Sequence, residues 1–87
     1  MLITAIFAYP VRTETLLQLI RSEEGIGKGV VVPRYTVFIS SEKTADYWLS
    51  RLIAATGQTR ICVTASTDIA TNIADEAFKD WLSKAIK

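Results

Sequence analysis

Four stretches of the chain carry the hydrophobic pattern of β-strands. The clearest covers residues 35–39, where Tyr, Val and Ile alternate with Thr and Phe and predict a central, half-buried strand. Residues 2–9 are apolar almost throughout, which is typical of a strand buried on both faces, and Pro10 would end it. Further strands are predicted at residues 30–32, a run of valines, and at residues 60–65.

Three other stretches place apolar residues at helical spacing. The first helix would begin at Thr13, as its N-cap, and end at Gly25. The second would follow Ser41 and end at Gly57, and the third would be capped by Asp75. The residues expected to face the sheet are Leu16, Leu17 and Ile20, then Ala45, Trp48, Leu49, Leu52 and Ile53, then Phe78, Trp81, Leu82 and Ala85. Those expected to face water include Gln18, Arg21, Glu24, Asp46, Tyr47, Ser50 and Arg51.

The elements follow one another as strand, helix, strand, strand, helix, strand and helix. Residues 30–32 and the next strand would form a hairpin, or else one long strand with a bulge at Pro33. Residues 67–74 fit neither repeat clearly. This order predicts an α+β fold, a ferredoxin-like βαββαβ sandwich with an additional C-terminal helix, because the crossover rule then lays the first two helices on one face of an antiparallel sheet. Residues 1–87 are expected to form a single domain.

Composition narrows the possible chemistry. A single cysteine, Cys62, excludes an intramolecular disulfide, fits a cytoplasmic protein, and is expected to be a buried thiol in mid-strand. The absence of histidine excludes Ser-His and Cys-His pairs and zinc sites built on imidazole. A core drawn from 87 residues is small, so a homodimer is expected to add burial. The apolar N-terminus is too short to span a bilayer and lacks the features of a signal peptide, so no membrane association is predicted.

Positively charged residues offer a candidate interface for nucleic acid. The formal net charge of +1 provides no overall attraction for phosphates, so binding would need a local patch. Lys28 and Arg34, near the ends of the predicted hairpin, are candidates for phosphate contact, and Arg12, Arg51 and Arg60 would extend the patch.

Other chemistry-bearing residues have plainer explanations. Tyr9, Tyr35 and Tyr47 offer rings for stacking on bases, but the first two lie in predicted strands, which favours core or dimer contacts. The glycines of residues 25–29 follow a helix, whereas phosphate-binding loops follow a strand, so a flexible loop is predicted. Adjacent carboxylates diverge around a helix and are better explained by helix ends than by a metal ion. No catalytic residue, metal site or cofactor is predicted.

Five stretches over nearly the whole chain share a succession of hydrophobic and aromatic positions with a known family: the strand ending at Tyr9, the Tyr35-Thr-Val-Phe-Ile strand, the helix with Leu52, the Arg60-Ile-Cys-Val strand and the closing Phe78-Lys-Asp-Trp81-Leu82. In these positions the chain resembles the CRISPR-associated Cas-two superfamily. Within it the chain most closely resembles the small SinR-like proteins, which also close with an aromatic residue followed by a Trp-Leu helix.

This resemblance implies a ferredoxin-like homodimer. Members of the superfamily serve in spacer acquisition, as toxin or antitoxin components, or as metal-dependent nucleases. The nucleases carry Tyr-Asp at the end of the first strand, where the two Asp residues of a dimer bind a divalent ion. Here Tyr9 matches the tyrosine, but Pro10 occupies the Asp position and cannot be a metal ligand. The resemblance therefore implies a member without nuclease activity.

Three functions stay open from the sequence. The preferred one is a non-enzymatic, dimeric, Cas-two-like binding or interaction protein of a mobile-element or defence system, whose partner is a protein or a nucleic acid. The second is a Mg²⁺-dependent nuclease with carboxylates from Glu14, Glu42 or Asp46. The third is a ferredoxin-like module that binds a small effector in a dimer cleft, with residues 25–29 as a lid.

Overall fold

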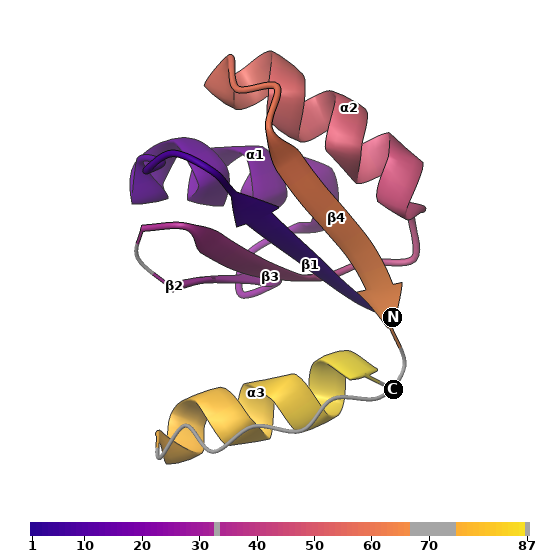
Figure 1. Cartoon of the computed structure of the whole chain (residues 1–87). Helices are drawn as coiled ribbons and strands as arrows, with labels where there is room; N and C mark the ends of the chain where they lie inside the picture. Colours follow the sequence, from indigo (N-terminus) through magenta and orange to yellow (C-terminus); the bar gives the residue numbers. More distant parts are fainter. Residues whose placement is uncertain (33, 67–74, 87) are drawn as a thin grey trace.

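A four-stranded antiparallel sheet forms the centre of the structure, and the elements follow one another in the predicted order (Figure 1). The computed structural model describes residues 1–32, 34–66 and 75–86, so Pro33 and the unassigned residues 67–74 lie outside the described residues. The elements are β1 (Leu2–Phe7), α1 (Thr13–Glu24), β2 (Gly29–Val32), β3 (Thr36–Ser40), α2 (Ala45–Thr56), β4 (Ile61–Ser66) and α3 (Glu76–Ile86). None of these described helices is both long and apolar enough to cross a membrane.

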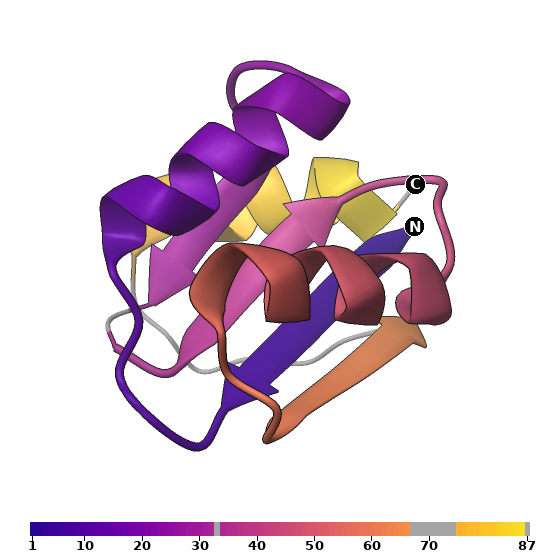
Figure 2. The same ribbon diagram turned by 90° about the horizontal axis from the view of Figure 1, so that it is seen from above.

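The strands lie in the order β2, β3, β1, β4, which is the ferredoxin-like topology. β1 lies between β3 and β4, and Ala5 faces Val37 on one side and Val63 on the other. β2 and β3 pair as an antiparallel hairpin, so the alternative of one long bulged strand is wrong. α1 and α2 each connect two strands that are separated by a third, and both cover the same face (Figure 2). The predicted fold, with its additional C-terminal helix, is confirmed.

The main core lies between this face and the two covering helices. Trp48 and Leu52 of α2 are fully buried, as their helical spacing predicts. The other buried members are Ile3, Ala5, Phe7, Leu16, Ile20, Val37 and Ile39. On α1 the prediction for Leu17 is wrong, because Leu19, three residues after Leu16, packs against the core, whereas Leu17 does not.

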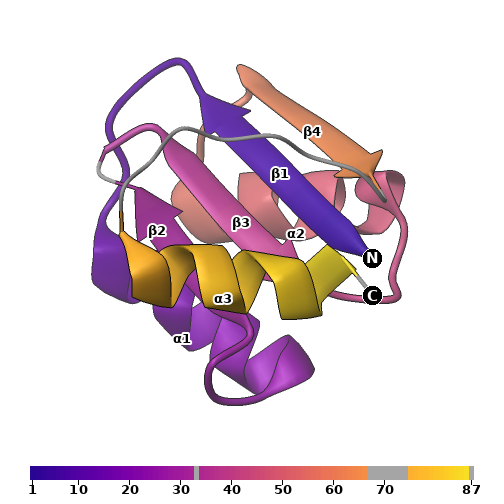
Figure 3. The same ribbon diagram turned by 90° about the horizontal axis from the view of Figure 1, so that it is seen from below.

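A second, smaller core lies on the opposite face, where α3 crosses the sheet (Figure 3). Phe78, Leu82 and Ala85 of α3 are buried against Leu2, and the Phe78 ring lies 5.5 Å from that of Phe38, as measured between centroids. The predicted apolar stripe of α3 is thus confirmed. A further residue of this face, Ile6, is 52% exposed, so the expectation that the first strand is buried on both faces holds for only part of its length.

The observed helix caps agree with the caps predicted from the sequence at some helix ends and differ at others. Asp75 caps α3 as predicted, since its carboxylate accepts a hydrogen bond from the Phe78 N–H at 3.2 Å. Gly57 ends α2 with a positive φ of 73°, also as predicted. α1, however, begins at Thr13 itself, and the residue in the cap position makes no side-chain cap bond. α2 is capped by Thr44 rather than entered at Ser41, because the Ser41 side chain is buried and used elsewhere.

Candidate functional site

The last residue of β1 and the loop that follows it are joined by backbone hydrogen bonds to two segments that are distant in the sequence. The bonds run from Phe7 N–H to the Tyr35 carbonyl (2.7 Å), from Ala8 N–H to the Arg60 carbonyl (3.0 Å) and from Val11 N–H to the Arg34 carbonyl (3.0 Å). Arg12, Arg34 and Arg60 therefore lie around one end of the sheet, although they are far apart in the chain. We call these arginines, with Tyr9 and Tyr35, the arginine end.

Gln58 fixes the same loop from the connection between α2 and β4. Its Nε2 donates to the carbonyl oxygens of Tyr9, at 3.0 Å, and of Pro10, at 3.2 Å. Its Oε1 accepts from the Tyr9 N–H at 3.3 Å. One amide side chain thus binds backbone groups on both sides of the Tyr9 side chain, which restrains the direction in which that ring leaves the loop.

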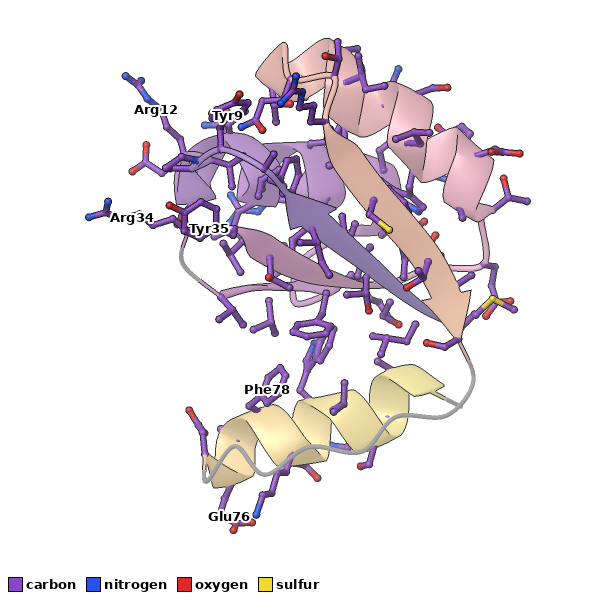
Figure 4. The ribbon with its side chains drawn as sticks, in the orientation of Figure 1. Tyr9, Arg12, Arg34, Tyr35, Glu76 and Phe78 are labelled. Carbon is purple, nitrogen blue, oxygen red and sulfur yellow. The ribbon has the colours of Figure 1, made fainter. Side chains whose placement is uncertain are left out.

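The side chains of the arginine end face solvent. Figure 4 shows Tyr9, Arg12, Arg34 and Tyr35 at the same corner, with both guanidinium groups projecting outward. Tyr9 is 55% exposed and Tyr35 is 46% exposed. The core contacts expected for these tyrosines are not formed, because β1 ends at Phe7 and β3 begins only after Tyr35, so both rings lie just outside the sheet ladder. The alternative of dimer contacts stays a prediction.

The arginines of this end have no close carboxylate partner within the described part of the chain. None of the three arginines forms an ion pair with a described carboxylate. Glu14, in the first turn of α1, is the nearest acidic residue to Arg12 along the sequence. A shallow pocket of about 190 Å³ adjoins the loop, lined by Pro10, Val11, Arg12, Thr15, Thr56 and Gln58. The arrangement presents guanidinium donors and aromatic faces beside a restrained backbone.

The other two predicted phosphate-contacting residues lie elsewhere. Lys28 precedes β2, whereas Arg34 follows it, so the length of the strand separates them, and the Lys28 carbonyl accepts from the Ser40 N–H at 2.8 Å at the opposite end of the sheet. Arg51 is engaged in an ion pair, with its Nη2 at 2.7 Å from an oxygen of Glu23. The predicted five-residue patch is therefore not one surface, and three of its members come together.

Glu23 is the centre of a charge network that joins α1 to α2 at the end of the sheet nearest Met1. It contacts Lys43 Nζ at 3.0 Å and Arg51, and it accepts a hydrogen bond from the Tyr47 hydroxyl. The bond from Tyr47, then that from Lys43, lowers the pKa of Glu23 from 4.5 to about 2. The same carboxylate raises the pKa of Lys43 and that of Tyr47, in each case mainly through the hydrogen bond.

Glu24 and Ser41 extend this group inward. The Ser41 hydroxyl donates to Glu24, and its oxygen accepts from the Trp48 indole N–H at 2.9 Å. Lys43 lies 3.5 Å from the same Glu24 carboxylate. The prediction that Glu24 faces water is wrong, because its side chain reaches the buried serine. We call Glu23, Glu24, Ser41, Lys43, Tyr47 and Arg51 the Glu23 network.

The carboxylates considered for metal-assisted hydrolysis are not brought together. Glu42 pairs with the amino group of Met1 at 3.2 Å, and Asp46 lies in the first turn of α2, close to the same end of the sheet. Glu14 lies at the start of α1, near the arginine end. The second hypothesis, a metal site with carboxylates from Glu14, Glu42 or Asp46, therefore gains no support from their positions in this chain. Within residues 1–32, 34–66 and 75–86, no group of three or more Cys, Asp or Glu side chains is placed to hold a metal ion.

Two further expectations change with the tertiary structure. The loop at residues 25–29, considered as a lid, is tied to α3, because the Trp81 indole N–H donates to the Gly27 carbonyl at 2.7 Å. Lys28 and Trp81 line a pocket of about 180 Å³ beside this contact. Cys62 is exposed rather than buried, since its side chain lies on the face of β4 that α1 and α2 do not cover.

Comparisons with protein-family models, with curated proteins and with solved structures found no match to this chain. The resemblance to the Cas-two superfamily accordingly stays a prediction from hydrophobic and aromatic positions. What this chain binds has to be argued from its own geometry. The residue that the sequence did not single out is Gln58, since its partners are 48 and 49 positions away and no local pattern marks such a contact.

Proposed function

We propose that this protein is a non-enzymatic nucleic-acid-binding protein that contacts phosphates with its arginine end and acts as a homodimer. The observation that carries the proposal is the convergence of Arg12, Arg34 and Arg60 around one restrained loop, without an ion pair to any described carboxylate. Guanidinium groups match phosphate oxygens in geometry and stay charged at any physiological pH.

The distribution of charge supports this choice of surface. The chain as a whole carries a formal net charge of +1, so three arginines without a described ion pair make a local positive region at one end of a nearly neutral molecule. The cations of the Glu23 network, by contrast, have their charge compensated by Glu23 and Glu24. A polyanion is therefore attracted to the arginine end in preference to the Glu23 network.

The homodimer is proposed to form through the outer edge of β4. Among the described strands β4 pairs with β1 alone, so the backbone groups of its other edge have no described ladder partner. Its sequence, Ile-Cys-Val-Thr-Ala-Ser, contains no charge and no proline, the devices that usually protect an edge strand from pairing. A second β4 in antiparallel orientation would continue the sheet across a two-fold axis.

The family resemblance also implies a homodimer. It implies a non-enzymatic protein as well, because Pro10 stands in place of a metal-binding Asp. If the resemblance is correct, the protein is a component of a defence system or mobile element, working in the cytoplasm. The proposal for the arginine end does not depend on that placement, because it rests on the positions of the side chains.

Salt-dependent binding of a fluorescent oligonucleotide tests the phosphate contacts. We expect affinity to fall steeply between about 50 and about 200 mM salt, and the log–log slope should become shallower by about 0.7 to 0.9 for each phosphate that is no longer neutralised. The variant Arg12→Ala/Arg34→Ala/Arg60→Ala should bind weakly with a shallow slope. A control variant, Arg21→Ala/Lys28→Ala, removes two exposed cations elsewhere and should bind as the wild type does.

Equal affinity and slope for the triple variant and the control would contradict the proposal. The oligonucleotide should also stay intact with Mg²⁺ present, and cleavage that a chelator abolishes would show that the protein is an enzyme. The dimer is tested by sedimentation of the wild type and of Thr64→Lys, which places like charges on both copies of the exposed β4. A wild type that sediments as a monomer at all concentrations would rule out the dimer without affecting the binding proposal.

A further inference from the structure

We infer that the arginine end takes nucleic acid with unpaired bases, which stack on Tyr9 and Tyr35, and that Gln58 is the positioning residue that holds Tyr9 for this contact. The inference rests on the proposed function and specifies its substrate class as single-stranded DNA or RNA. It starts from two exposed aromatic rings at the end of the sheet where the backbones of the three arginines meet, and from the hydrogen bonds that restrain the backbone under one of those rings.

Both tyrosine rings are accessible for stacking. More than half of Tyr9 and nearly half of Tyr35 is exposed. Neither ring forms an aromatic pair or a cation–π contact with a described residue, and neither hydroxyl has a hydrogen bond in the described part of the chain. Tyr47 differs, because its hydroxyl is bound to Glu23 and its ring contacts Trp48. An exposed, unengaged tyrosine beside cations is the arrangement that binds bases in single-stranded complexes.

The backbones that carry these rings are held in place. Tyr9 has both its N–H and its carbonyl bound by Gln58, and the carbonyl of the next residue, Pro10, is bound as well. The Tyr35 carbonyl accepts from the Phe7 N–H at 2.7 Å, and its neighbour Arg34 accepts from Val11. A ring on a restrained backbone loses less conformational freedom when a base stacks on it, so more of the stacking free energy appears as affinity.

The exposed tyrosine rings favour a nucleic acid whose bases are unpaired. In a duplex both faces of every internal base are already stacked on neighbours, so an exposed tyrosine has no base face to contact without distorting the helix. In a single strand the bases are accessible while the phosphates stay available to Arg12, Arg34 and Arg60. Duplex nucleic acid would engage the arginines alone. Selectivity for single strands is therefore attributed to the tyrosines, and salt-dependent affinity to the arginines.

Gln58 is assigned its role from its hydrogen bonds, although its side chain also lines the pocket beside Arg12. Its described hydrogen bonds from the side chain all go to backbone atoms of those two residues. Replacing it with Ala removes the three bonds and leaves the ring in place on a less restrained loop. Replacing it with Glu keeps the acceptor but removes the two donated bonds and adds a negative charge beside the arginines.

The first experiment compares labelled single strands with a hairpin duplex of the same composition, as DNA and as RNA, by fluorescence anisotropy at fixed salt. We expect the wild type to bind single strands at least about tenfold more tightly. Tyr9→Ala and Tyr35→Ala should each weaken single-strand binding by about 5- to 150-fold, the range that corresponds to loss of one stacked base, with little change for the duplex. Tyr9→Phe, which keeps the ring, is the matched control and should bind normally.

A double-mutant cycle tests the role of Gln58. If Gln58 acts through Tyr9, Gln58→Ala should weaken single-strand binding in the wild type and have almost no further effect in the Tyr9→Ala protein. A thermal unfolding curve for each variant separates this from a loss of folded protein. An equal effect of Gln58→Ala on single strand and duplex, in both backgrounds, would show a merely structural role and overturn the assignment.

The outcomes separate this inference from the proposed function. Equal binding of duplex and single strand, with Tyr9→Ala and Tyr35→Ala unchanged, refutes the inference while the arginine contacts stand. Binding that disappears with the arginine variant but not with the tyrosine variants has the same meaning. No binding of any DNA or RNA at low salt overturns both. Preference for RNA over DNA, or the reverse, identifies the source of the single strand and supports the inference.

Discussion

The two ends of the sheet carry similar residue types and use them differently. Near Met1, the Glu23 network pairs its charged side chains across α1 and α2 and connects them to the buried Ser41 and Trp48. At the arginine end, Arg12, Arg34 and Arg60 have no described carboxylate partner, and two tyrosines stand exposed. The difference is that arginine and tyrosine join two helices where carboxylates meet them and stay exposed to solvent where no described carboxylate does.

The physical reason lies in what each end has to connect. Near Met1, one helix ends and the next begins over the same part of the core, so charges from both helices are close enough to pair. At the arginine end, loops meet through backbone hydrogen bonds, and their side chains project outward. We therefore expect substitutions near Met1 to alter stability and substitutions at the arginine end to alter binding.

The largest effect on stability is expected from Trp48→Ala. Trp48 is fully buried and its indole N–H binds Ser41, so the substitution creates a cavity and removes one of the two hydrogen bonds that the buried Ser41 hydroxyl oxygen accepts. Loss of a buried aromatic side chain costs about 3 to 5 kcal/mol. The matched substitution at the arginine end, Tyr35→Ala, should cost less than about 1 kcal/mol. Urea unfolding measures both, and equal losses would contradict the division between the two ends.

The next largest effect is expected from Gly57→Ala, at the end of α2 that lies beside Gln58. Gly57 has a φ of 73°, and a Cβ there would meet open space, so the cost is backbone strain without a clash. A left-handed conformation costs an alanine about 1 to 2 kcal/mol. Because Gln58 follows directly, this substitution should also weaken single-strand binding. Gly57→Asn, which tolerates this conformation better, is the control, and an equal loss of stability for both, measured by urea unfolding, would argue against a backbone cause.

A smaller effect, dependent on pH, is expected from Glu23→Gln. The lowered pKa of Glu23, about 2 against 4.5, means that its contribution is present above pH 4.5 and is lost as pH falls towards 2. The raised pKa values of Lys43 and Tyr47 mean that their contributions are present below their ordinary values and are lost as pH rises through the raised ones.

The measurement for Glu23→Gln is thermal stability across pH. The variant should be less stable than the wild type near neutral pH, and the difference should shrink both in acid and in strong alkali, since all three pKa shifts depend on the same carboxylate. Oligonucleotide binding at neutral pH should be unchanged. A difference that is constant across pH would show that Glu23 stabilises the fold without its ionic contacts to Lys43 and Arg51.

The smallest effect on stability is expected from Arg34→Ala, which should lie within about 0.5 kcal/mol of the wild type, because it removes no described ion pair. Its affinity for nucleic acid should nevertheless fall. Arg51→Ala should behave in the opposite way, because it removes the 2.7 Å contact to Glu23 and lies outside the arginine end. Unfolding and anisotropy measurements on the two variants therefore form a direct test. Identical changes in stability and in affinity for the two variants would contradict the difference between the two ends.

Much of the fold could be predicted from local patterns in the sequence. The alternation at residues 35–39 predicted β3 and the faces of its side chains, and the spacing of Phe78 and Leu82 predicted the buried stripe of α3. Errors concentrated where a tertiary contact competes with a local signal. Ser41 resembles a helix cap in the sequence but binds Trp48 and Glu24 in the structure, so Thr44 caps the helix instead.

The sequence predicted which types of residue form the candidate site but not which individual residues belong to it. Arg12, Arg34 and Arg60 were identified as possible phosphate contacts, yet nothing in the sequence separated them from Lys28 and Arg51. Tyr9 and Tyr35 were predicted to lie within strands because strand ends are hard to locate: two residues decide whether Tyr9 belongs to the ladder or to the loop beyond it.

The sequence by itself determined the order of elements, the faces of the strands and helices, and the absence of histidine chemistry, because hydrophobic periodicity and composition are local properties. The tertiary structure decided which of the described charges meet a partner. That depends on strand order and on backbone bonds between segments tens of residues apart, such as the contact of Gln58 with Tyr9. Such contacts form only when the sheet is assembled, and they place three arginines and two tyrosines at one end of this protein.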